Sequence, residues 1–146
     1  MKILLLGCGH IGRYIYELLS TKHEVVAVDK AKGCPAAVQQ DALEVPLGGY
    51  DIVINALPGN VAYKASRRVV EAGLDIIDVS FYAEDPFTLH EAAVKTGARY
   101  VPDAGVAPGL SNILAGRLVA DLGHVDELGI YVGVYPKDPW VRWVIR

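Results

Sequence analysis

Short apolar runs alternate with longer segments of helical periodicity along most of the chain. An apolar run of four to six residues, without polar interruptions, is typical of a strand that is buried on both faces. The sequence predicts such strands at Ile3–Leu6 and Val25–Val28. It predicts further strands at Asp51–Leu57, Asp75–Ser80 and Arg99–Asp103, each closed by Pro, Ser or Gly, and a weaker one near Val38–Asp41.

The segments between these runs carry apolar residues at helical spacing. After the first run, apolar positions recur at i, i+3, i+4, i+7 and i+8, which predicts one helical stripe: Ile11, Tyr14, Ile15, Leu18 and Leu19. Further helices are predicted at 61–72, 86–97 and 110–122. The last has the stripe Leu110, Ile113, Leu114, Leu118 and Leu122 and ends before Gly123, a common helix stop.

Apolar strands that alternate with helices indicate a parallel sheet covered on both faces. Right-handed crossovers then give a doubly wound α/β fold. The region 30–50 fits this plan less well, because Pro35, Pro46 and Gly48-Gly49 leave room for only a short helix and a weak strand. We expect residues 1–123 to form this domain, with an abbreviated crossover.

The pattern changes after Gly123. Residues 125–135 alternate like a strand, and Trp140–Ile145 is apolar up to the C-terminus. We interpret 124–146 as the first strand and the tail of a second, truncated domain. An apolar tail of this kind would be costly to leave in water, which predicts self-association.

The composition of the chain argues against several classes of protein. A chain of 146 residues with 52% hydrophobic and 21% charged residues is typical of one globular domain. Its apolar runs are far shorter than the roughly 18 residues that span a bilayer, and its N-terminus has no signal-peptide pattern. The net charge of −3, with scattered Lys and Arg, argues against nucleic-acid binding. We expect a cytoplasmic protein that binds neither membrane nor nucleic acid and, from its dispersed Cys and His, no metal.

A G-x-G-x-x-G motif stands between the first predicted strand and the first predicted helix, and its residues are Gly7, Cys8, Gly9, His10, Ile11 and Gly12. In this context the motif predicts a dinucleotide-binding turn. Gly7 would permit the tight turn, Gly9 the approach of a pyrophosphate, and Gly12 close helix packing, while the helix N-terminus supplies N–H donors. The alternative is a glycine turn that binds no nucleotide.

Asp29 ends the second predicted strand, 17 residues after Gly12. A carboxylate at this place accepts hydrogen bonds from the adenosine ribose and repels a 2′-phosphate, which favours NAD. Lys30 and Lys32 follow directly, so NADP stays open as a cofactor. The alternative role for Asp29 is to cap a turn.

Three more loops follow strands at the sheet edge where doubly wound folds bind ligands. The first holds Asn55, Ala56, Leu57 and Pro58, and the second holds Asp78 and Ser80. We expect both to contact the cofactor, or to serve as turns and as partners of loop amides. In the third loop Asp103 is the one ionisable residue, and it is our candidate for orienting substrate or moving a proton. The alternative is that Asp103 holds its loop by accepting from backbone amides.

These motifs resemble the saccharopine dehydrogenase-like family, above all its L-lysine 6-dehydrogenase branch. The likeness covers residues 1 to about 135 and rests on Gly7–Gly12 with Asp29, on Asp51–Pro58 and on Asp78–Ser80. The run Asp103–Asn112 is its most family-specific part.

The resemblance implies a Rossmann NAD(P)-binding fold and oxidation at the C–N bond of an amino acid or its imine adduct. Hydride would pass between the nicotinamide and the carbon that bears nitrogen. In the family a second domain supplies much of the substrate pocket and the dimer contact. We therefore expect mainly the cofactor-binding part of such an enzyme, with NAD or NADP, an amino-acid-like substrate and a homodimer formed through the C-terminal strand and tail.

Two alternatives come from other classes. A stand-alone nucleotide-sensing regulatory module of the potassium-transport type uses the same glycine motif and acidic residue at a similar length. Such a module does not need the Asp103–Asn112 loop. An interaction subunit that keeps the fold without a ligand would have no reason to keep both the intact turn and Asp29.

Overall fold

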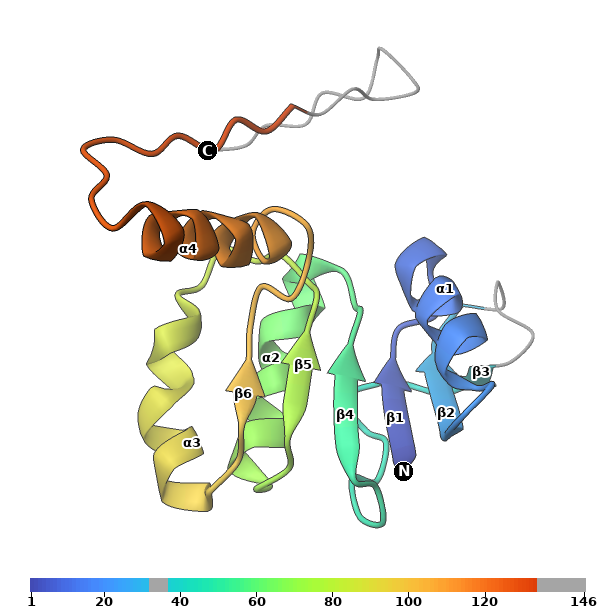
Figure 1. Cartoon of the computed structure of the whole chain (residues 1–146). Coiled ribbons are helices and arrows are strands. Elements are labelled where there is room, and N and C mark those ends of the chain that lie inside the picture. The colour runs from blue at the N-terminus through green and yellow to red at the C-terminus, as the bar shows by residue number, and fades with distance from the viewer. Residues whose placement is uncertain (32–36, 134–146) are drawn as a thin grey trace.

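The apolar runs form a parallel sheet in the computed structural model, which describes residues 1–31 and 37–133. Within these residues the sheet has six strands in the order β3-β2-β1-β4-β5-β6 (Figure 1). Every neighbouring pair is parallel. The strands are β1 (Lys2–Leu6), β2 (Glu24–Asp29), β3 (Ala37–Gln39), β4 (Ile52–Asn55), β5 (Ile76–Asp78) and β6 (Tyr100–Val101). The strand order reverses between β1 and β4, so the predicted doubly wound α/β fold is confirmed.

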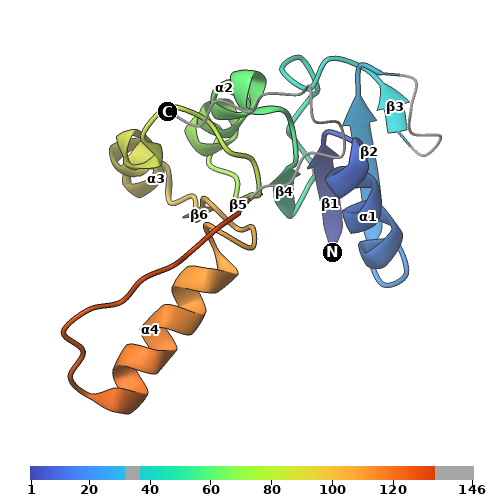
Figure 2. The same cartoon turned by 90° about the horizontal axis from the view of Figure 1, so that it is seen from above.

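Helices cover both faces of this sheet. The first helix, α1 (His10–Leu19), lies on one face, and α2 (Gly59–Glu71) lies with α3 (His90–Thr96) on the other (Figure 2). Side chains of β1 alternate between the two layers, as a strand requires. Leu4 and Leu6 join the core under α2, whereas Ile3 and Leu5 join the core under α1.

The helix predicted at 86–97 is formed in two pieces. A 3-10 turn, η1 (Pro86–Leu89), precedes α3 and is capped by the Asp85 side chain, which accepts from the Phe87 amide over 2.9 Å. The last turn of α3 ends at Gly97, whose φ of 77° is left-handed.

The buried face of α1 differs from the predicted stripe. Gly12 is buried against the sheet, and Ile15, Tyr16 and Leu19 pack on the core at helical spacing from it. Ile11, Tyr14 and Leu18 of the predicted stripe are exposed instead. Because α1 approaches the sheet closely at Gly12, the helix is turned about its axis relative to the predicted orientation. Gly12, which has no side chain, lies at the centre of the contact.

The helix α4 (Leu110–Leu122) forms where it is predicted, but none of its residues is buried. It lies above the carboxyl edge of the sheet and extends away from it (Figures 1 and 2). The stripe from Leu110 to Leu122 is exposed because no described element covers it.

The strand predicted at 125–135 is wrong for residues 125–133, which form no strand. A lone extended segment leaves its backbone groups unpaired, and no described strand lies beside this one. The predicted apolar tail at 140–145 and Lys32 lie outside the described residues, and the division at 123/124 stays a prediction. No helix in the described part of the chain is long and apolar enough to cross a membrane.

Candidate functional site

The glycine turn joins the end of β1 to α1 at the point where β1 and β4 lie side by side. Gly7 has a φ of 91°, and a Cβ on it would lie 2.6 Å from the Ala56 carbonyl oxygen. A Cβ on Gly12 would lie 2.1 Å from the Gly7 oxygen, whereas a Cβ on Gly9 would meet nothing within 4 Å. Gly7 and Gly12 are therefore required by packing, and Gly9 has a free face toward open space.

The N-terminus of α1 opens on that same space. Gly9 is its N-cap residue, and no side chain caps the helix. The first helical bond runs from the Arg13 amide to the Gly9 carbonyl over 2.9 Å. Among the described residues, nothing accepts from the amides of Gly9, His10 and Ile11. Free donors at the positive end of a helix fit a pyrophosphate, so the geometry of the turn matches the predicted cofactor.

Asp29 lies at the end of β2 beside the turn and is half-buried. Its Oδ2 accepts from the Cys8 amide over 2.6 Å, and its Oδ1 accepts from the Ala31 amide over 2.8 Å. The turn-capping role is thus present in the structure. A carboxylate has about four acceptor positions, so two remain for ribose hydroxyls, and the two roles of Asp29 are compatible.

A buried polar network joins β4, β5 and α2 under the neighbouring loops. The side chains of Asn55, Ser66 and Asp78 have no exposed surface. Asn55 Nδ2 lies 2.9 Å from Ser66 Oγ and 3.2 Å from Asp78 Oδ2, and Ser66 Oγ donates to the same carboxylate oxygen over 2.5 Å. Burial raises the pKa of Asp78, against the opposing effect of the hydrogen bonds that it accepts.

This network links three of the predicted site loops. Asp78 Oδ1 accepts from the Ser80 amide over 2.8 Å, and the Asp78 carbonyl accepts from the Ala104 amide over 2.8 Å. Asp78 therefore bonds a loop amide, one of its two predicted roles. Because Asn55 and Asp78 are enclosed, contact with a cofactor would come from the backbone around them, and from Ala56, Leu57 and Pro58, which reach the surface. Their cofactor-binding role stays a prediction.

Ser66 belongs to this network but is missing from the sequence-based candidates. It lies on the buried face of α2, in helical register with Ala62, Val69 and Val70. A hydroxyl in an otherwise apolar helical face is the signal that could have identified it, because a buried polar group needs a partner.

Two tyrosine hydroxyls lie beside the network. Tyr82 and Tyr100 share a hydrogen bond, and the Tyr63 ring meets the Tyr82 ring edge-on at a centroid distance of 5.5 Å. Burial raises the pKa of Tyr100 to about 12 and raises that of Tyr82 as well. Both hydroxyls are therefore protonated near pH 7.

Contacts within the 103–112 loop itself fix its conformation. Asp103 has a φ of 54°, and a Cβ on Gly109 would lie 2.2 Å from the Gly105 oxygen. Asn112 Oδ1 accepts from the Gly109 amide over 3.0 Å. Within residues 1–31 and 37–133, the Asp103 carboxylate accepts no hydrogen bond, so the role in which it holds the loop amides is not present.

A cavity of about 800 Å³ lies between α1 and this loop. Its lining includes Ile11 and Ile15 of α1, Val79 to Phe81 after β5, and the segment from Asp103 to Pro108. Asp103 is the one ionisable residue among the described residues of its lining. The cavity thus brings Ile11 of the predicted turn, Ser80 and Asp103 to one place, whereas Asn55 and Asp78 are not among the described residues of its lining.

We compared the chain with known proteins by sequence and by structure. No family model matches the chain. Saccharopine dehydrogenase [NADP(+), L-glutamate-forming] of Schizosaccharomyces pombe is 23% identical over 155 residues, which cover 92% of this chain and 34% of that protein. Apo saccharopine dehydrogenase (L-Glu forming) from Saccharomyces cerevisiae superposes with a TM-score of 0.71 at 19% identity, over 84% of this chain and 31% of that one.

A more distant structure has the same fold. The WlbA dehydrogenase from Bordetella pertussis, in complex with NADH and UDP-GlcNAcA, superposes with a TM-score of 0.53 at 18% identity, over 69% of this chain and 37% of that one. The chain spans about a third of the length of its saccharopine dehydrogenase relatives. The chain is thus similar in sequence to a saccharopine dehydrogenase over most of its own length, as its motifs predict, and it has the fold of another.

Proposed function

We propose that this chain is the cofactor-binding part of a nicotinamide dinucleotide-dependent oxidoreductase. One observation carries the proposal: the uncapped N-terminus of α1 meets open space at Gly9, with the Asp29 carboxylate beside it. Free amides suit the pyrophosphate, and a carboxylate at the end of β2 suits the adenosine ribose. The homology to saccharopine dehydrogenases and the NADH-bound fold relative support the same cofactor class.

The cavity between α1 and the 103–112 loop is the natural place for the nicotinamide half. It opens beside the glycine turn at the carboxyl edge of the sheet, where doubly wound folds bind their ligands. When bound there, the nicotinamide supplies hydride transfer to or from the carbon of the substrate. Ile11, Ile15 and Val79 would exclude water from that ring.

The finer proposal is oxidation at the C–N bond of an amino acid or its imine adduct. It is supported by the sequence similarity and by Asp103, which lines the cavity and whose carboxylate accepts no hydrogen bond from the described residues. A carboxylate at this place would orient a cationic amine or accept its proton. The structured 103–112 loop favours this enzyme over the regulatory module, which does not need it.

The proposal also includes the assembly and the location. We infer a homodimer in the cytoplasm, formed through residues 124–146 as the sequence predicts, and we add α4 to this contact. The exposed leucines of α4 support self-association, because a row of large apolar side chains is costly to leave in water. Light scattering at micromolar concentration, with and without residues 137–146, tests the dimer, and an unchanged monomer would contradict it.

Calorimetric titration with NAD, NADH, NADP and NADPH tests the cofactor. The decisive pair of variants is Gly9→Ala and Gly48→Ala, because an added Cβ meets nothing within 4 Å at either position. Both should fold normally, but only Gly9→Ala places a methyl group where the pyrophosphate would approach. We expect binding by the wild type and Gly48→Ala and at least about tenfold weaker binding by Gly9→Ala. Absence of binding by all four nucleotides would overturn the proposal.

A further inference from the structure

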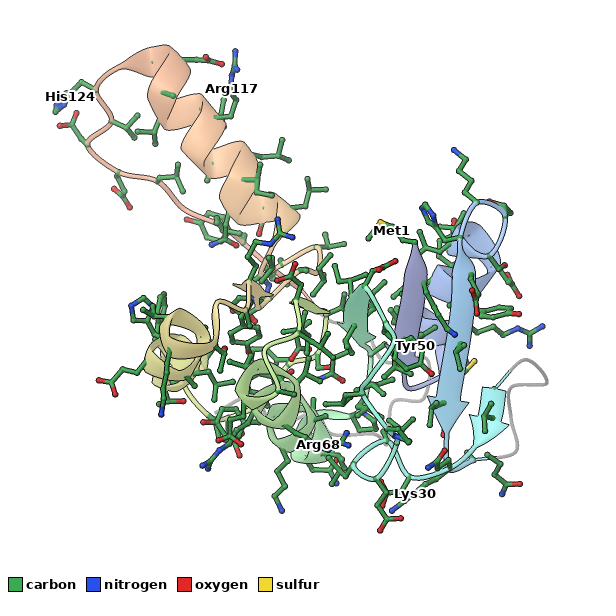
Figure 3. The ribbon with its side chains drawn as sticks, turned by 90° about the horizontal axis from the view of Figure 1, so that it is seen from below. Met1, Lys30, Tyr50, Arg68, Arg117 and His124 are labelled. Atoms are coloured by element: carbon green, nitrogen blue, oxygen red, sulfur yellow. The ribbon has the colours of Figure 1, made fainter. Side chains whose placement is uncertain are left out.

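A charged pair lies next to Asp29. Lys30 follows Asp29 at the end of β2, and its Nζ lies 2.7 Å from Asp41 Oδ2. In Figure 3 Lys30 is seen on the side of the molecule away from α4 and its labelled Arg117. The pair thus lies next to Asp29, where the adenosine ribose would bind.

The backbone fixes Asp41 in this position. The Gln40 amide donates to the Asp29 carbonyl over 3.2 Å, which places the residue after it beside the end of β2. The second carboxylate oxygen of Asp41 accepts from the Leu43 amide over 2.9 Å. Asp41 is half-buried, whereas Lys30 is exposed. The fold therefore fixes the position of the Asp41 carboxylate, and the exposed Lys30 side chain extends to it.

The charges around Lys30 are mostly negative. The hydrogen bond to Asp41 raises the pKa of Lys30, and Glu44 adds a smaller effect of the same sign. In return, the hydrogen bond to Lys30 lowers the pKa of Asp41. Besides Asp29, its neighbour in sequence, the carboxylates of Asp41 and Glu44 act on this cation, and Asp41 is its ion-pair partner.

NADP differs from NAD by a phosphate on the 2′-hydroxyl of the adenosine ribose. A site that accepts this phosphate needs a cation next to the end of β2, and a carboxylate there repels it. Lys30 is the described cation with the right place in the chain, but Asp41 already binds its ammonium group. A 2′-phosphate would have to displace Asp41 while it meets two other carboxylates.

We propose that Asp41 is a specificity-determining residue, which binds Lys30 and so withholds it from a 2′-phosphate, making the site select NAD over NADP. The inference rests on the proposed function, since it concerns the same cofactor site. It predicts the opposite preference from the NADP(+) in the name of the Schizosaccharomyces pombe relative.

The test is a double-variant cycle read out by calorimetric binding of NAD and NADP. Asp41→Asn removes the negative charge but keeps an oxygen for the Leu43 amide. Asp41→Asn combined with Lys30→Gln then removes the released cation. Glu71→Gln is the matched control, because it removes one carboxylate from another exposed ion pair, that with Arg67 on α2.

We expect the wild type to bind NAD at least about tenfold more tightly than NADP. In Asp41→Asn the affinity for NADP should rise about fivefold, with NAD unchanged within about twofold. The double variant should lose that gain, Glu71→Gln should change neither nucleotide, and the gain should shrink as salt is added.

Three results would overturn the inference: a wild type that prefers NADP, an unchanged ratio in Asp41→Asn, or a gain that persists without Lys30. Melting temperatures of all variants exclude unfolding as the cause of a lost affinity. If neither nucleotide binds to any variant, the proposed function itself fails and this inference falls with it. Binding of NAD with an unchanged ratio would sink the inference alone.

Discussion

The carboxylate of Asp29, at the end of β2, accepts a hydrogen bond from the backbone amide of Cys8 in the glycine turn over 2.6 Å. The same side chain accepts from the Ala31 amide, so it ties the turn after β1 to the chain that leaves β2. A residue that the cofactor would contact is thus also part of what shapes the cofactor turn. Its two roles have to be separated by choice of substitution.

Asp29→Ala and Asp29→Asn should separate them. The alanine variant removes both acceptors and leaves the amide of the buried Cys8 without its partner, so we expect a loss of about 2 kcal/mol in the free energy of unfolding. The asparagine variant keeps one acceptor oxygen and should lose about half as much. Urea denaturation measures both, and equal stability of the two variants and wild type would show that Asp29 does not hold the turn.

The glycine turn gives a second prediction, on packing. A Cβ at position 12 would lie 2.1 Å from the Gly7 carbonyl, and only a shift of α1 away from β1 can relieve this contact. We therefore expect Gly12→Ala to lower the free energy of unfolding by at least about 2 kcal/mol. Gly9→Ala, where a Cβ meets nothing within 4 Å, is the control and should unfold close to wild type. A fully stable Gly12→Ala would contradict the close approach.

Much of this geometry could be predicted from local sequence. The strands of the sheet are uninterrupted apolar runs, and the glycine turn has a fixed place between a strand and a helix, so both follow from neighbours in the chain. The positions of Asp29 and Asp103 follow in turn, because parallel strands end at one edge of the sheet. The strands and the turn depend on residues within a few positions of each other.

The predictions that were wrong concern features that depend on segments far apart in the sequence. The apolar stripe of α4 has the right period for a buried face, yet Ile113 and Leu118 are exposed because nothing in the described residues covers them. The alternation at 125–133 is typical of a strand, but a strand also needs a neighbour. The Tyr82–Tyr100 pair was missed for the same reason, since the two residues are far apart in sequence. Ser66 was missed although its place on an apolar helical face is a local signal, and only its partner Asp78 is distant.

The tyrosine pair lends itself to a double-variant cycle. Tyr82 and Tyr100 are half-buried, and each hydroxyl is the hydrogen-bond partner of the other. Tyr82→Phe or Tyr100→Phe alone leaves one hydroxyl without that partner, at a cost of about 1 kcal/mol. The double variant should cost less than the sum of the two single variants, because it removes both polar groups together. Strict additivity of the three unfolding free energies would argue against the hydrogen bond.

The raised pKa of Asp78 predicts an unusual pH dependence of the free energy of unfolding. Burial raises its pKa in the folded chain above the ordinary value of 3.8, so the folded state holds this proton more tightly than the unfolded state does. As pH rises from about 3.8 through the raised pKa, the unfolded state gives up the proton first. The contribution of Asp78 to stability therefore falls over this range, with a slope of at most about 1.4 kcal/mol per pH unit.

The measurement is the free energy of unfolding against pH for wild type, Asp78→Asn and Asp75→Asn. Subtracting the Asp78→Asn curve should leave a stability that declines as pH rises above about 3.8. Asp75 is the control of opposite sign, because its hydrogen bonds with Arg99 lower its pKa. Its contribution is present above 3.8 and is lost as pH falls below that value. If both differences slope the same way, burial does not control the charge of Asp78, and its network must hold the carboxylate ionised as firmly as an ion pair would.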